Sequence, residues 1–252
     1  GRVLNTRDFY FKTNISEKDD EFVVSLKSYI SENIYVVYEY IFPKNGYMFK
    51  VNFKSVGMEA FLDNNQPPKV NWSTNVFRNS RSIDYENRYT ELTFGYEDDR
   101  VDYLSLSGDD EENRENIRWI SYRQHFFSAI LIPESSIKSV NLKSKDLSGD
   151  QILEEKFTKY FESSYLLPKQ GENINTTFKF YYGPTDYKTL QNLEGDLEAS
   201  IPMGWGIFGW INKFIFLPLF GFLSSFLSYG IAIIVMTIIV RLLMSPVTYK
   251  SY

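Results

Sequence analysis

The sequence predicts a mainly β protein: an antiparallel β-sandwich domain over residues 1–198, followed by two apolar helical segments. Aromatic and β-branched residues alternate with polar ones in several runs before residue 198. Beyond that point the chain becomes strongly apolar, and none of the 32 Asp and Glu residues lies after Glu198. Period-two alternation indicates strands with one buried face, whereas a long apolar run indicates a helix that enters or lies on a membrane.

Three alternating runs carry the strand prediction. They read NIYVVYEYIF (33–42), YMFKVNFKSV (47–56) and TTFKFYYGP (176–184), and each places aromatic or β-branched residues at alternate positions. Gly and Pro residues punctuate the region, as expected of turns between antiparallel strands. So long a stretch of strands predicts two packed sheets in one domain rather than two domains.

The segments between these runs are less regular. Residues 61–75 and 107–116 are predicted to be loops, because the first is long and polar and the second is a run of charges. Residues 150–167 fit a helix or a strand equally well. The single histidine, His125, is expected to be a packed or partly exposed side chain within an aromatic-rich strand rather than a catalytic base.

Composition argues against several classes of function. Residues 1–198 carry 24 Lys and Arg against 32 Asp and Glu, with no basic cluster apparent, so nucleic-acid binding is not expected. The chain has no cysteine and one histidine, which excludes Cys-based and multi-His metal centres, and we expect no metal site. We expect no catalytic residues and no cofactor, because no convergent carboxylates or Gly-rich phosphate loop stand out. The first residues do not read as a signal peptide, so we expect the chain to be truncated at its N-terminus.

The first apolar segment, residues 199–228, is predicted to be an amphipathic helix at the membrane interface. Trp205 and Trp210 stand at its start, as is favoured at the headgroup level, and Lys213 can reach water from there. The segment is also long enough to span a bilayer. The interfacial interpretation is favoured because a span here has to turn back almost at once.

The second apolar segment, residues 229–252, is predicted to be a transmembrane helix with a polar stripe. Thr237, Arg241, Ser245 and Thr248 follow one another at intervals of four, four and three, which places them on one face of a helix. A guanidinium near a bilayer centre costs roughly 2.5–3.5 kcal/mol. The stripe therefore indicates a helix that lines something polar; the alternative is an arginine that merely extends to the membrane surface.

The end of this segment gives two further expectations. Pro246 is predicted to kink or end the helix, because it cannot donate a backbone hydrogen bond. Lys250 follows the span and the acidic region precedes it. The positive-inside rule therefore predicts a cytoplasmic C-terminal end, with residues 1–198 on the other side.

Taken together, residues 204–252 resemble the start of the core of the YidC membrane protein insertases. The shared features are an aromatic-rich amphipathic helix, a glycine-started aliphatic span, an arginine and then Pro-x-Thr. Upstream, WISYRQHFFSAILIP (119–133) resembles a strand of the family's large periplasmic domain. FYYGPTDYKTLQNL (180–193) resembles the strand end and short helix that lead toward the membrane. Residues 1–80 match only as alternating strands.

The resemblance implies a fold, a location and partners. The fold is an antiparallel β-supersandwich like that of sugar mutarotases, placed in the periplasm at the bacterial inner membrane. Arg241 is expected in a hydrophilic groove open to cytoplasm and lipid. The implied partners are nascent membrane proteins, Sec translocon subunits, the lipid bilayer and, through parts outside this chain, the ribosome. The family's N-terminal anchor and later spans are not in this sequence, so the groove needs helices from elsewhere.

Three functions remain to be compared. The resemblance favours a membrane protein insertase and chaperone that works alone or with the Sec translocon. The alternative is a membrane-anchored extracytoplasmic β-sandwich that binds a glycan or a protein partner. A carbohydrate epimerase requires convergent acid and base groups, and the sequence offers no such constellation.

Overall fold

The computed structural model describes residues 3–59, 61, 67–97, 99–167, 173–204 and 206–250, with the backbone alone at residues 247, 248 and 250. The chain divides into two compact units, Gly1–Ser200 and Ile201–Tyr252.

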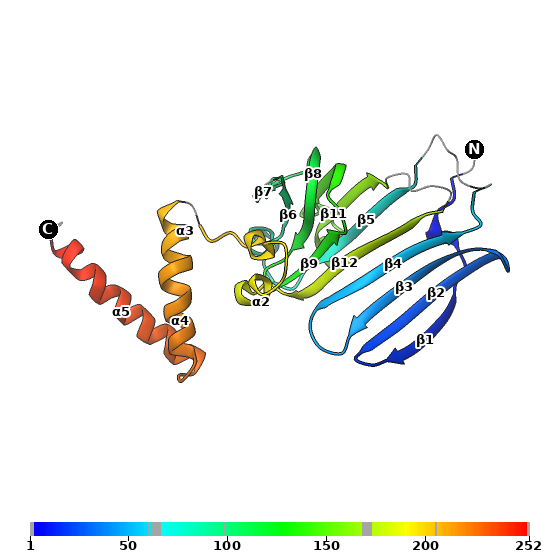
Figure 1. Cartoon of the computed structure of the whole chain (residues 1–252). Coiled ribbons are helices and arrows are strands. Elements are labelled where there is room, and N and C mark those ends of the chain that lie inside the picture. Colours follow the sequence, from blue (N-terminus) through cyan, green and yellow to red (C-terminus); the bar gives the residue numbers. More distant parts are fainter. Residues whose placement is uncertain are drawn as a thin grey trace. The chain divides into compact units, whose positions relative to one another are not determined.

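The first unit is built mainly of antiparallel strands (Figure 1). The strands in its described residues are β1 (Lys12–Lys18), β2 (Glu21–Ser31), β3 (Ile34–Pro43), β4 (Met48–Val56), β5 (Lys69–Phe77), β6 (Glu91–Tyr96), β7 (Arg100–Tyr103), β8 (Asp110–Arg123), β9 (Phe127–Pro133), β10 (Ile137–Asp146), β11 (Phe157–Leu166) and β12 (Asn175–Pro184). The short helices are α1 (Ile83–Asn87), α2 (Tyr187–Gln191) and the 3₁₀ helices Thr6–Asp8 and Leu197–Ser200.

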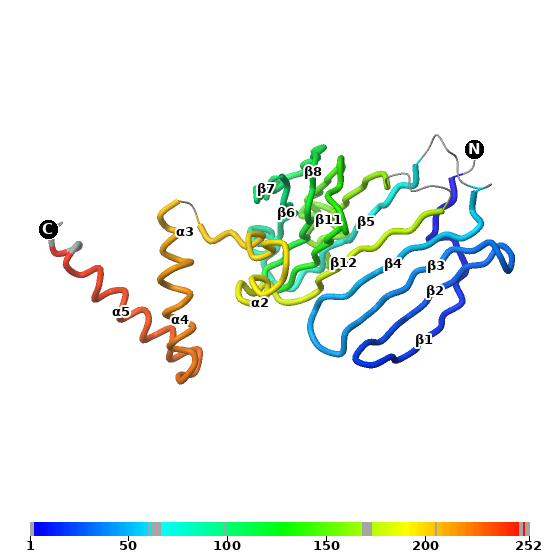
Figure 2. Tube along the Cα trace, in the orientation of Figure 1, coloured from blue at the N-terminus to red at the C-terminus, as the bar shows by residue number. Residues whose placement is uncertain are grey.

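These strands form one hydrogen-bonded sheet in the order β1-β2-β3-β4-β12-β9-β8-β10-β11-β5, with β6 paired to β8 and β7 paired to β6. Figure 2 shows β1 to β4 running side by side as long hairpins. The long strand β8 is the branch point, because its first half pairs with β10 and its second half with β9 and β6. The sheet therefore has two wings, one ending at β1 and the other at β5.

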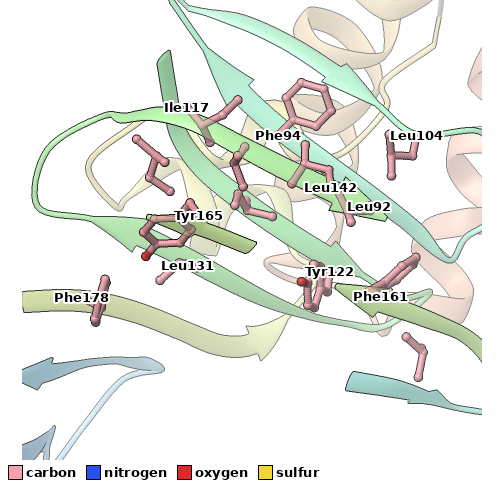
Figure 3. Close-up of a cluster of buried hydrophobic side chains, with 14 of the residues drawn as sticks. Leu92, Phe94, Leu104, Ile117, Tyr122, Leu131, Leu142, Phe161, Tyr165 and Phe178 are labelled. Carbon is pink, nitrogen blue, oxygen red and sulfur yellow. The ribbon is translucent and has the colours of Figure 1, made fainter. Parts of the chain in front are cut away.

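Parts of the two wings face each other across a common core. Trp72 of β5 stacks on Tyr122 of β8, with ring centroids 3.9 Å apart, and meets Phe180 of β12 at 5.7 Å. Burial of apolar side chains between the wings drives this closure. The core, part of which is drawn in Figure 3, contains Val76, Leu92, Phe94, Leu104, Ile117, Ile120, Tyr122, Leu131, Ile137, Val140, Leu142, Phe161, Tyr165, Leu167 and Phe178. The predicted sandwich is confirmed, and it is made by one folded sheet rather than by two separate ones.

The three alternating runs form β3, β4 and β12, as predicted. β4 and β12 are paired so that Phe49 lies opposite Phe180 and Val51 opposite Phe178. Residues directly opposite each other in an antiparallel pair share a face, so the aromatic positions gather on one side of the sheet.

The loop predictions were partly wrong. Asp110–Asn116 opens β8, where Glu111 is paired with Lys143 of β10 at 2.7 Å and Arg114 with Asp102 of β7 at 3.1 Å. Cross-strand ion pairs thus allow a run of charges to form a strand. In the other predicted loop, residues 69–75 belong to β5, and residues 62–66 lie outside the described residues. Segment 150–167 resolves into a turn followed by β11.

Two buried cations of this unit have partners within the protein. Arg123 and Glu91 form an ion pair and are 4% and 5% exposed. Lys159 is also buried, and its ammonium donates a hydrogen bond to the Leu106 carbonyl at 2.7 Å. Burial lowers the pKa of Lys159, as expected for a cation taken out of water.

The second unit consists of two helical stretches. The first joins α3 (Ile207–Ile211), the π-helical turn Asn212–Phe216 and α4 (Leu217–Ser224); the second is α5 (Tyr229–Lys250). In the π turn the Leu217 N–H reaches back to the Asn212 carbonyl. This wider turn stands just before Pro218, where a regular helix loses a hydrogen bond. α5 runs through Pro246 to Lys250, so the proline does not end the helix.

Candidate functional site

The predicted polar stripe lies on α5. The spacing Thr237–Arg241–Ser245 on a continuous helix places these residues on one face. The Thr237 hydroxyl donates a hydrogen bond to the Ile233 carbonyl at 2.8 Å, which satisfies it within its own helix. Arg241 is exposed in this chain. The Thr248 side chain lies outside the described residues, so the C-terminal end of the stripe stays a prediction.

Most of the rest of α5 is apolar, and much of it is exposed. Its exposed residues include Ile231, Ile233, Ile234, Ile238, Leu242 and Leu243. The segments Ile207–Ser224 and Tyr229–Pro246 are each 18 residues long and apolar enough to cross a membrane. Length and composition alone do not distinguish a crossing helix from an interfacial one, so the predicted division of this region at residue 228 stays a prediction.

Arg241 differs from the paired cations of the β domain in having no acidic residue within its own unit. Residues 199–252 contain no Asp or Glu, so no side-chain carboxylate of its own unit can pair with Arg241. A guanidinium offers five N–H donors and remains charged at any physiological pH. Arg241 can therefore attract a carboxylate that comes from outside this unit.

Two of the predicted interface residues, Trp210 and Lys213, lie in the first helical stretch. Trp210 is exposed and contacts Phe214 at 5.7 Å between ring centroids, and Lys213 is exposed one turn of helix along. Trp205 lies outside the described residues. The Asn212 amide donates a hydrogen bond to the Met203 carbonyl at 2.7 Å, which fixes the chain entering α3.

The two helical stretches touch where they are joined. Phe220 and Tyr229 stack with ring centroids 6.0 Å apart, and Leu223 of α4 and Ala232 of α5 are buried. This contact holds the joint between α4 and α5, while most of the remaining apolar surface of both helices is exposed. Lipid or further helices can cover that surface.

The structure corrects the placement of His125. It lies in the turn between β8 and β9, not in a strand, and its ring is stacked between Tyr89 at 4.2 Å and Phe126 at 4.1 Å. A packed aromatic environment was expected, but the exposed rings beside it were missed. The signal that could have found them is the polar pair Arg123–Gln124, which interrupts the apolar alternation just before Phe126 and Phe127.

Within the parts of the chain that the structure describes, no group of three His, Asp or Glu residues is placed to hold a metal ion.

A family model described as the YidC periplasmic domain matches residues 1–218. The chain belongs to the YidC family. The membrane protein insertase YidC of Parabacteroides distasonis is 32% identical over 268 residues, covering all of this chain and 40% of that protein. The same-named protein of Bacteroides fragilis is 31% identical, covering 99% of this chain and 41% of its own length. The chain thus spans about two fifths of the curated relatives that it matches.

Membership of the YidC family sets the location of the two units. The family has a periplasmic domain attached to the inner membrane, and the chain contains both that domain and two candidate spans. The β domain is therefore periplasmic, and the apolar helices belong to the inner membrane.

A solved galactose mutarotase related enzyme from Lactobacillus acidophilus also resembles the chain. It is 11% identical, covers 68% of this chain and 70% of its own, and superposes with a TM-score of 0.35. A score this low carries no argument, so the mutarotase-like arrangement of the sandwich stays a prediction.

Proposed function

We propose that this chain acts as part of a membrane protein insertase and chaperone, in which the polar stripe of α5 forms one wall of a hydrophilic groove. The observation that carries the proposal is Arg241, a permanent cation on an apolar helix whose own unit holds no acidic residue. The names of the longer relatives support the activity.

The mechanism follows from where the charge lies. In a groove bordered by lipid, Arg241 attracts acidic groups on a hydrophilic segment of the substrate more strongly than it does in water, because the local dielectric constant is lower. The flanking hydroxyls of Thr237 and Ser245 keep the wall polar. The apolar remainder of α5 then lets the substrate's hydrophobic segment pass into lipid.

One helix cannot enclose a groove, so other helices complete it in this proposal. The substrates are nascent membrane proteins. The Sec translocon and the ribosome are proposed partners, the latter through segments that this chain does not contain. α5 crosses the membrane with its C-terminal end in the cytoplasm, as the positive-inside rule predicts.

The helix from Ile207 to Ser224 has a supporting role in this account. It lies in the membrane interface, with Trp205 and Trp210 at the headgroup level and Lys213 directed to water. The boundaries are those expected from the sequence: 1–198 for the β domain, 199–228 for this helix and 229–252 for the transmembrane helix.

The test is insertion by a full-length protein carrying this chain. Arg241→Ala is expected to impair insertion of substrates whose translocated segment is acidic, whereas Leu242→Ala at the next position serves as the matched control. Normal insertion by Arg241→Ala, at an equal amount of protein in the membrane, removes the arginine from the mechanism.

A second candidate function rests on the aromatic face of β3, β4 and β12. Phe49 lies 4.9 Å from Phe42, 5.6 Å from Phe180 and 5.3 Å from Tyr182, measured between ring centroids, and Tyr182 is half exposed. Rings of this kind can stack on sugars or on a protein partner. Calorimetric titration of the detergent-solubilised chain with common oligosaccharides tests the glycan version, and absence of binding counts against it.

A further inference from the structure

We propose that the turn between β8 and β9 is a membrane-contacting tip, which inserts exposed aromatic rings into the headgroup region of an anionic bilayer. The tip consists of Tyr85, Tyr89, His125, Phe126 and Phe127, and it is called the aromatic tip below. The proposal goes beyond insertion and does not depend on Arg241 or on any substrate.

The aromatic tip exposes large apolar rings on one rigid base. Phe126, Phe127 and Tyr85 are 63%, 61% and 45% exposed. Tyr89, His125 and Phe126 are stacked in that order, with ring planes 8° and 14° apart, and Tyr85 meets His125 edge-on at 5.7 Å. Stacking preorganises these rings, so their insertion costs little conformational entropy. Exposed aromatic rings beside polar groups suit the bilayer interface.

Hydrogen bonds fix this base to the sheet. The Gln124 N–H donates to the Phe127 carbonyl at 2.8 Å, closing the turn. The Thr185 N–H donates to the Phe126 carbonyl, also at 2.8 Å, and the Asn79 amide donates to the Gln124 side chain at 3.3 Å. The turn is therefore held by the end of β12 and by the segment before α1.

The charge around the aromatic tip favours an anionic surface. The two segments that build it, 78–90 and 123–127, contain four arginines, of which Arg123 is buried and paired with Glu91, and one exposed acidic residue, Asp84. Arg81 and Arg88 are exposed, whereas Glu86 is buried and accepts hydrogen bonds from the backbone of Asn79 and Ser80. An arginine close to an anionic bilayer favours association by about fivefold.

The connection of this end of the sheet to the membrane helices favours a bilayer, rather than a soluble partner, as the surface that the aromatic tip contacts. Thr185, which is bonded to the turn, precedes by 16 residues the unit that begins at Ile201 and carries the two candidate spans. This end of the sheet is thus covalently tied to membrane helices. The opposite end, at the β2–β3 hairpin, is separated from it by the full length of β12.

The experiment uses the absence of native cysteines in the 252-residue chain. Phe126→Cys is labelled with an environment-sensitive fluorophore, and the chain is reconstituted into phosphatidylcholine vesicles with or without phosphatidylglycerol. Quenching by nitroxides on shallow lipid positions is compared with quenching by aqueous iodide. Ile30→Cys, at an exposed position in the opposite hairpin, is the matched control.

The label at residue 126 is expected to be quenched by lipid nitroxides at least about twofold more than the label at residue 30. The excess is expected to fall when phosphatidylglycerol is omitted or when Arg81 and Arg88 are replaced by Gln. Quenching by iodide without quenching by lipid overturns the proposal. Protection of residue 126 from both quenchers also overturns it, because a protein partner or a second copy then covers the tip.

Discussion

The β domain and the apolar helices treat charge in opposite ways. In the β domain Arg123 is buried, and Glu91 beside it supplies the matching charge. In α5 Arg241 lies on an apolar helix whose unit contains no acidic residue. A buried charge is tolerated only when paired or hydrogen-bonded. The contrast is that the β domain pairs a buried charge internally, whereas α5 carries a charge for which its own unit contains no carboxylate.

The largest effect is expected from a substitution that breaks the Arg123–Glu91 ion pair of the β domain. Glu91→Gln keeps the shape of the side chain but leaves Arg123 buried without its counter-charge, which is expected to lower the free energy of unfolding by about 3–5 kcal/mol. Urea unfolding of the chain in detergent, followed by near-UV circular dichroism, measures it. Glu111→Gln, in an exposed pair with Lys143, is the control and is expected to change little; equal effects contradict the assignment.

Replacing one leucine in each region compares the contribution of packing to stability. Leu142 is 0% exposed in the core and Leu242 is 67% exposed on α5. Leu142→Ala is expected to cost about 2–5 kcal/mol, through lost burial and a residual cavity. Leu242→Ala is expected to leave unfolding of the β domain unchanged. The same urea titration measures both, and a large effect of Leu242→Ala argues against an exposed apolar face.

A smaller effect is expected from removing the Tyr122 hydroxyl, which makes a polar contact between the two wings of the sheet. The Tyr122 hydroxyl donates a hydrogen bond to the Trp72 carbonyl at 2.7 Å and lies 2.7 Å from the Ser163 hydroxyl. Tyr122→Phe is expected to cost about 1–3 kcal/mol, because buried polar atoms lose a partner. Thermal unfolding measures the loss, and the exposed Tyr103→Phe is the control. A neutral Tyr122→Phe shows that ring packing alone closes the two wings.

The smallest effect is a pH dependence confined to the β domain. Burial raises the pKa of Tyr181 to about 12. The unfolded chain then loses this proton near pH 10 while the folded chain keeps it, so the contribution of Tyr181 to stability falls as pH rises above about 10, by about 1 kcal/mol at pH 11. Burial also raises the pKa of Tyr122 and of Tyr165, and both add to the fall. Urea titrations between about pH 8 and pH 11, a range that brackets the ordinary tyrosine pKa, measure this change in stability. Tyr181→Phe is expected to reduce the fall; an unchanged fall assigns it to other groups.

Local alternation was enough to predict much of the β domain. The runs that form β3, β4 and β12 follow period two, and that period needs one buried face. The β8 segment around Glu111 was missed, because its stability comes from Lys143 on another strand. The position of His125 was missed for a similar reason: a turn there depends on a hydrogen bond from Thr185, some 60 residues further along.

The candidate site was predictable to the extent that it lies on one helix. The spacing of Thr237, Arg241 and Ser245 specifies a shared face because an α-helix has a fixed period. The aromatic tip could not be predicted in the same way. Its rings come from α1 and the turn after it, and from the β8–β9 turn and the first residue of β9, segments which only the folded sheet brings together.

The most direct test of the account asks whether the charge of Arg241 acts on acidic substrates. Membrane insertion by a full-length protein carrying this chain is measured by protease protection, for one substrate with an acidic translocated segment and for its neutralised counterpart. Arg241→Ala is expected to impair insertion of the acidic substrate only, and Arg241→Lys to restore part of it. Equal insertion of the acidic substrate by wild type and Arg241→Ala, at matched protein levels, contradicts the account.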